Sequence, residues 1–134
     1  MSRLLCASLF ATAMALSGSV SAAPRVTDAR CTVDAPTWES QRVRCHLPPG
    51  PPDQPQRFTA RFSGSHDDTM LSLAASLNQA ALPCAEGSKT KSRFEDGEVT
   101  LSCLFAIEGG AAVDFEALLQ VSHADFDGFT LAPP

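Results

Sequence analysis

The 134-residue sequence contains no tyrosine, one tryptophan and two lysines, and it lacks the motifs that most often carry enzyme chemistry. It has no Cys-x-x-Cys pair, no Gly-x-Ser-x-Gly elbow, no His-Glu-x-x-His helix and no glycine-rich phosphate loop. Basic residues number ten against fifteen acidic ones. Because nucleic-acid binding needs clustered basic charge, the composition argues against a nucleic-acid partner.

Long apolar runs are also scarce, and the only one lies at the N-terminus, from Leu4 to Leu16. Arg3 precedes it, and small residues follow over positions 17–23, as in a cleavable secretory signal. The alternative, a membrane anchor, is disfavoured because a spanning helix needs about 20 apolar residues. We therefore expect cleavage after Ala22, a mature chain without a transmembrane segment, and a periplasmic or extracellular location.

Removal of residues 1–22 as a signal peptide leaves residues 23–134, a length that fits a single domain with one modest core. Nine basic and fifteen acidic residues remain, for a net charge of −6, and the charge is uneven. Residues 23–64 carry +2 and residues 65–134 carry −8. Such an acidic surface favours cations or basic partners, or serves only to keep the protein in solution.

Four cysteines remain after the signal, and in a small exported chain an even number predicts a disulfide framework. Four cysteines allow three connectivities. We favour Cys31–Cys45 and Cys84–Cys103, because each pair flanks a predicted β-hairpin. No cysteine pair has the spacing of a zinc ribbon.

Apolar and polar residues alternate with a period of two along much of the chain, which predicts short β-strands. Residues 112–121 fit either a strand or a short helix, and we favour the strand. A proline-rich segment, 48–56, is predicted to be an extended connecting loop. The pattern predicts an all-β fold, a small antiparallel sandwich or barrel of about seven or eight strands. The expected strands are 29–34, 41–47, 57–63, 69–77, 80–84, 89–94, 99–107, 112–121 and 129–131, the fifth and sixth being the least certain.

A basic cluster, formed by Lys89, Lys91 and Arg93, alternates with Thr90 and Ser92, so its three charges would share one face of a strand. Such a face could meet an acidic partner or a phospholipid surface. Acidic residues follow immediately at 95–98, so we favour a charged edge strand that faces solvent. The same segment contains Asp96-Gly97, a dipeptide typical of hairpin turns.

Two segments resemble each other, Ser65-His66-Asp67-Asp68 and residues 122–127, Ser-His-Ala-Asp-Phe-Asp. Each follows a predicted strand. If the two loops met, their imidazoles would suit a transition metal such as zinc, and their carboxylates would suit calcium. The alternative is that serine, aspartate and glycine simply shape turns. The candidate ligands are His66, Asp68, His123, Asp125 and Asp127.

Three functions remain open from the sequence. The first is an exported, non-catalytic binding or accessory domain whose partner is an unidentified protein or envelope component. The second is a β domain that binds a divalent cation. The third is a small secreted hydrolase, which we disfavour because serine, histidine and aspartate adjacent in sequence do not make a catalytic triad. No catalytic residue is predicted and no cofactor is required.

Overall fold

The computed structural model describes residues 28–34 and 39–134, so the predicted signal peptide lies outside the described residues. The described part of the chain is all-β, as predicted, and contains nine strands. Within these two ranges there is no helix that is long and apolar enough to cross a bilayer. The strands are β1 (Cys31–Val33), β2 (Ser40–Leu47), β3 (Gln54–Ser65), β4 (Met70–Leu77), β5 (Ala80–Leu82), β6 (Lys91–Arg93), β7 (Gly97–Ile107), β8 (Val113–Ser122) and β9 (Asp125–Ala132).

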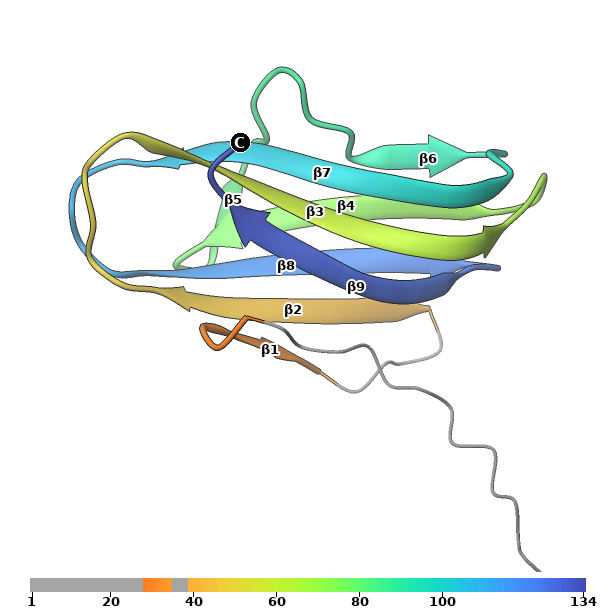
Figure 1. Cartoon of the computed structure of the whole chain (residues 1–134), viewed down its shortest axis with the longest axis horizontal. Coiled ribbons are helices and arrows are strands. Elements are labelled where there is room, and N and C mark those ends of the chain that lie inside the picture. Colours follow the sequence, from red (N-terminus) through yellow and green to blue (C-terminus); the bar gives the residue numbers. More distant parts are fainter. Residues whose placement is uncertain (1–27, 35–38) are drawn as a thin grey trace, which may run out of the picture.

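The strands form two antiparallel sheets that pack as a sandwich. The larger sheet has six strands in the order β1-β2-β8-β4-β5, with β6 paired to β4 beside β5. The smaller sheet has three strands in the order β7-β3-β9. In Figure 1 the smaller sheet lies in front of β4 and β8 of the larger one. The chain therefore passes between the sheets several times, and these crossings decide which loops meet.

The core lies between the sheets and consists of the alternate, inward-facing residues of both. Phe58 and Phe62 of β3 and Phe115 of β8 are almost completely buried. The Phe115 ring stacks on Phe105 at a centroid distance of 4.9 Å and lies 5.4 Å from Phe58. These rings pack the two sheets directly against each other. Their burial follows the period-two alternation of apolar residues in the sequence.

The largest differences between observed and predicted strand boundaries are at the starts of β3 and β9. The proline-rich connection ends earlier than expected, because β3 begins at Gln54 and includes Pro55, which pairs with Ala106. Proline is tolerated there because β9 reaches only to Arg57 on the other side, so β3 has a single neighbour at Pro55. The segment 112–121 is a strand, as favoured. The last strand begins at Asp125, earlier than the predicted residue 129.

The Asp96-Gly97 segment does not close a hairpin, contrary to its sequence signal. β6 pairs with β4 in the larger sheet, whereas β7 belongs to the smaller sheet. The turn is therefore a crossing between sheets. Phe94 and Gly97 both have positive φ, 59° and 86°, which turns the chain from one layer to the other.

The expected strands 69–77 and 80–84 are joined as a hairpin. Asn78 and Gln79 connect β4 to β5, and both have positive φ, 47° and 69°, as in a two-residue turn of type I′.

Both predicted disulfides are present. Cys31–Cys45 joins two residues that are directly paired across β1 and β2 of the same sheet. Cys84–Cys103 joins the segment after β5 to the centre of β7, so it bridges the two sheets. Cys103 is completely buried.

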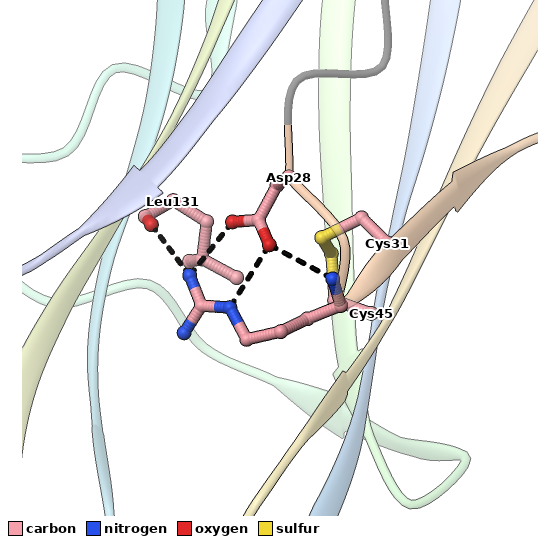
Figure 2. Close-up of a disulfide and its surroundings, with 5 residues drawn as sticks. Asp28, Cys31, Cys45 and Leu131 are labelled. Carbon is pink, nitrogen blue, oxygen red and sulfur yellow. Dashed lines mark hydrogen bonds and ion pairs between the residues drawn. A yellow bond between two sulfur atoms is a disulfide. The ribbon is translucent and has the colours of Figure 1, made fainter.

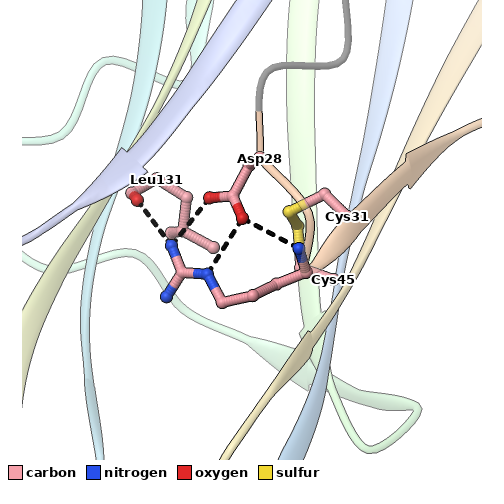
Figure 3. A network of polar contacts seen from close by, with 5 residues as sticks. Asp28, Cys31, Cys45 and Leu131 are labelled. Carbon is pink, nitrogen blue, oxygen red and sulfur yellow. Dashed lines mark hydrogen bonds and ion pairs between the residues drawn. A yellow bond between two sulfur atoms is a disulfide. The ribbon is translucent and has the colours of Figure 1, made fainter.

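An arginine network closes the other side of the sandwich. The Nη2 group of Arg30 donates to Asp28 Oδ2 at 2.7 Å and to the backbone oxygen of Leu131, in β9, at 2.9 Å. Figure 2 and Figure 3 show Asp28 and Leu131 beside the Cys31–Cys45 disulfide. These bonds tie the chain before β1 to the edge strand of the smaller sheet and lower the pKa of Asp28 through its hydrogen bond with Arg30.

Removal of the inter-sheet disulfide should destabilise the fold. The C84S/C103S variant is expected to lose about 3 kcal/mol of unfolding free energy, because the bond closes a loop of 19 residues in the unfolded chain. Urea denaturation of the oxidised proteins measures this. An unchanged midpoint and slope would contradict this expectation, because the disulfide would then add no constraint beyond that of the packed core.

The Asp28–Arg30 pair should make stability depend on pH in the acid range. Because the folded pKa of Asp28 is lowered, the contribution of the pair is complete above the unfolded value of 3.8 and is lost as pH falls through the folded pKa. Between about pH 5 and pH 3, wild type should lose more stability than Asp28→Asn. Asp96→Asn removes the same charge from an exposed turn and serves as the control. Parallel pH profiles for wild type and Asp28→Asn would contradict the expectation.

Candidate metal centre

Three turns gather at one end of the sandwich, on the right in Figure 1. They connect β3 to β4, β6 to β7 and β8 to β9. Each passes from one sheet to the other, because β3, β7 and β9 lie in the smaller sheet and β4, β6 and β8 in the larger one. The two Ser-His segments occupy the first and third of these turns, so the fold brings them to the same end.

Thr69, at the end of the β3–β4 turn, fastens the three turns together. It is 1% exposed, and its hydroxyl accepts a hydrogen bond from the backbone N–H of His66 at 3.0 Å. The same hydroxyl donates to the backbone oxygen of His123 at 2.9 Å. The backbone of Thr69 bonds to His66 O and, in the β6–β7 turn, to the N–H of Phe94. A single buried threonine thus sets the spacing of both histidine loops.

Potential ligand atoms cluster on the β3–β4 turn. One ligand atom each from His66, Asp67 and Asp68 lies within 4.8 Å of the others. His66 Nδ1 contacts Asp68 Oδ1 directly and lies 3.8 Å from Asp67 Oδ1. All three side chains are exposed, so a cation could reach them without moving the backbone.

The second histidine lies beside this cluster. The ring centroid of His123 is 6.0 Å from that of His66. Two imidazoles that share one ion must lie about this close, because metal–nitrogen bonds are about 2.0–2.1 Å long. His123 has a φ of 60°, a left-handed conformation that is uncommon for residues other than glycine. This tight turn positions the ring next to His66.

Asp125 and Asp127, two of the predicted ligands, lie away from the His66 cluster. Ser63 Oγ donates to Asp127 Oδ1 at 3.0 Å, and Asp125 pairs with Ser63 across β3 and β9. Both aspartates therefore belong to the start of β9, next to the bulge opposite Arg61 and Phe62.

The serines of the two Ser-His segments, Ser65 and Ser122, lie in different surroundings. Ser65 is buried, and its hydroxyl donates to the backbone oxygen of Glu95 in the β6–β7 turn rather than to a histidine. Ser122 lies at the end of β8, opposite Met70. The Ser65 hydroxyl is therefore not placed as the nucleophile of a triad.

Two residues that matter here are absent from the set of predicted ligands. Asp67 belongs to the first Ser-His segment and lies between two predicted ligands, His66 and Asp68. This position in the sequence could have identified it as a further ligand. Thr69 has no such signal, because its hydrogen bond to His123 spans 54 positions of the chain.

Comparison of the chain with protein-family models, with curated proteins and with solved structures yields no match in any of the three. The assignment of a function must therefore depend on the geometry of the residues themselves.

Removal of the Thr69 hydroxyl should loosen this end of the sandwich. Thr69→Val removes the hydroxyl partner of the part-buried His66 N–H and His123 carbonyl, which should cost about 1–3 kcal/mol of unfolding free energy. Thr69→Ser keeps the hydroxyl and is the matched control, with a smaller loss. Chemical denaturation of both variants tests this, and equal losses would show that the methyl group matters more than the hydrogen bonds.

Proposed function

We propose that this protein is an exported, non-catalytic binding domain whose paired histidine loops bind a transition-metal dication, with zinc as the best-suited ion. One observation carries the proposal: His66, Asp67 and Asp68 present ligand atoms within 4.8 Å of one another, with the His123 ring 6.0 Å from that of His66.

The donor set selects among cations. Imidazole nitrogen and carboxylate oxygen are both common zinc ligands, and a tetrahedral site needs four donors. His66, Asp67 and Asp68 supply three donors, and the His123 ring, 6.0 Å from that of His66, would supply the fourth after turning toward the ion. Calcium prefers six to eight oxygen ligands, and two carboxylates alone meet this poorly. The proximity of the two imidazoles therefore favours a transition metal over calcium.

Rigidity of the loops supports binding rather than accidental proximity. Because Thr69 hydrogen-bonds the backbone at both His66 and His123, the two rings are held near each other before any ion arrives. Preorganised ligands lose less conformational entropy on binding. The exposed position of the aspartates means that the ion would keep access to solvent or to a partner's ligand.

Two further features support export and a non-catalytic role. The two disulfides are typical of proteins in oxidising compartments, and the N-terminal pattern predicts a signal peptide over residues 1–22. The Ser65 hydroxyl donates to a backbone carbonyl, so it is not positioned as a nucleophile.

Zinc titration of the oxidised domain tests the metal site. Isothermal titration calorimetry with zinc chloride should show one ion per chain. The melting temperature should rise, because zinc at 100 times its dissociation constant adds about 2.7 kcal/mol of stability. His66→Ala and His123→Ala should each weaken binding about tenfold or more, since each removes one ligand.

His46→Ala is the matched control. His46 is also an exposed histidine next to a carboxylate, with its Nδ1 atom 2.8 Å from Asp114 Oδ1, but it lies in β2, far along the sheet from the turns. Its loss should leave zinc affinity unchanged. Absence of heat and of a melting shift in wild type would refute the metal site, and so would equal effects of the His46 and His66 variants.

A further inference from the structure

A broad groove crosses the outer face of the six-stranded sheet, on the side away from the core. Its volume is about 870 Å³, a size suited to a ligand of several rings. Residues of β4, β6 and β8 form most of its lining, and Glu39 lies at the rim next to β2. The lining includes the side chains of Met70, Ser72, Lys91, Arg93, Gln120 and Ser122.

The register of the sheet arranges the floor of the groove in rows. Ser72 pairs with Lys91 on one side and with Gln120 on the other, and the Ser72 hydroxyl donates to Gln120 Oε1 at 3.2 Å. Met70 similarly lies between Arg93 and Ser122. Side chains opposite each other in such pairs are about 4.5–5.5 Å apart, so each row is a short series of neighbouring hydrogen-bonding groups.

The β6 side of the groove carries unneutralised positive charge. Lys91 and Arg93 are exposed, on the same face of β6, and about 6.8 Å apart along the strand. Within residues 28–34 and 39–134, neither has an ion-pair partner. Several other cations of the described chain are paired, Arg42 and Arg44 with Glu116 and Lys89 with Glu95. Arg57 and Arg61, on β3 of the other sheet, have no ion pair among the described residues either. In an acidic protein, two free cations beside a groove favour an anionic ligand.

We propose that this groove binds a sugar acid, either free or as a unit of an acidic polysaccharide. Arg93 would bind the carboxylate through two parallel hydrogen bonds, and Lys91 would add a point charge. The serine hydroxyls and the Gln120 amide both donate and accept, which matches sugar hydroxyls. Met70, 49% exposed, offers an apolar surface to the C–H face of a sugar ring.

Glu39 makes the charge of the groove asymmetric. Its carboxylate lies at the rim on the β2 side, away from Lys91 and Arg93 on β6. A ligand carboxylate is therefore attracted to the β6 side, while Glu39 accepts hydrogen bonds from sugar hydroxyls. This site is separate from the histidine loops and does not depend on the proposed metal function.

Calorimetry and NMR titration of the oxidised domain, with EDTA present, test the proposal. The probes are galacturonic acid, trigalacturonate, the neutral trisaccharide maltotriose and the peptide triglutamate. Either galacturonate probe should bind and shift the amide signals of Ser72 and Gln120. Tighter binding of trigalacturonate identifies a polysaccharide as the source, and equal binding of the monomer identifies the free sugar acid.

Two double variants separate the groove from net charge. K91Q/R93Q should weaken galacturonate binding about tenfold or more, because both carboxylate partners are lost. R57Q/R61Q removes the same charge from exposed positions of β3 on the other sheet and should have no effect. Melting curves check that both variants are folded.

Four results would overturn the proposal. They are no binding of either galacturonate probe, equal binding of maltotriose, equal binding of triglutamate, and equal losses in the two double variants. Equal binding of triglutamate would indicate an acidic peptide as the ligand instead. Since zinc is removed throughout, a failure here leaves the histidine site untouched.

Discussion

Everything at the loop end of the molecule depends on the packing of phenylalanine rings between the two sheets. Phe58 of the smaller sheet lies against Phe115 of the larger one, and Phe105 stacks on Phe115 from the smaller sheet. The histidine turns each start in one sheet and end in the other. Burial of these rings holds together the sheets from which the turns start, and the Thr69 hydrogen bonds then fix the spacing of the two histidine loops.

The two open sides of this small sandwich are closed by different chemistry. On one side the Cys84–Cys103 bond joins the larger sheet to β7 covalently. On the other side Arg30 bonds the carbonyl of Leu131 and so occupies part of the free edge of β9. A domain of this size buries a modest fraction of its surface, and such cross-links compensate for a limited core. The covered edge also reduces the risk of pairing with another chain.

The two proposed sites meet at the start of β4 but have opposite electrostatic character. Thr69 fixes the acidic histidine loops, and Met70, the next residue, begins the groove with its cationic side. The alternation of a β-strand explains this proximity, since successive residues point to opposite faces. Thr69 is buried toward the turns, whereas Met70 faces outward. The start of β4 therefore joins the turn that carries the proposed cation site to the outer face that carries the proposed anion site.

Local patterns in the sequence were sufficient for most strands, for the all-β class and for the Cys31–Cys45 disulfide. The Cys84–Cys103 pairing was also predicted correctly, but the reason given, a shared hairpin, was wrong, because the bond joins the two sheets. Period-two alternation depends on neighbours along the chain, and Cys31 and Cys45 face each other across a local hairpin. Local patterns failed at β6, where Asp96-Gly97 signals a hairpin but the strand pairs with β4. No short segment of sequence reports this choice of partner strand. Likewise, only the tertiary structure brings His123 to His66 and leaves Asp125 and Asp127 on β9, because those positions follow from the packing of two sheets.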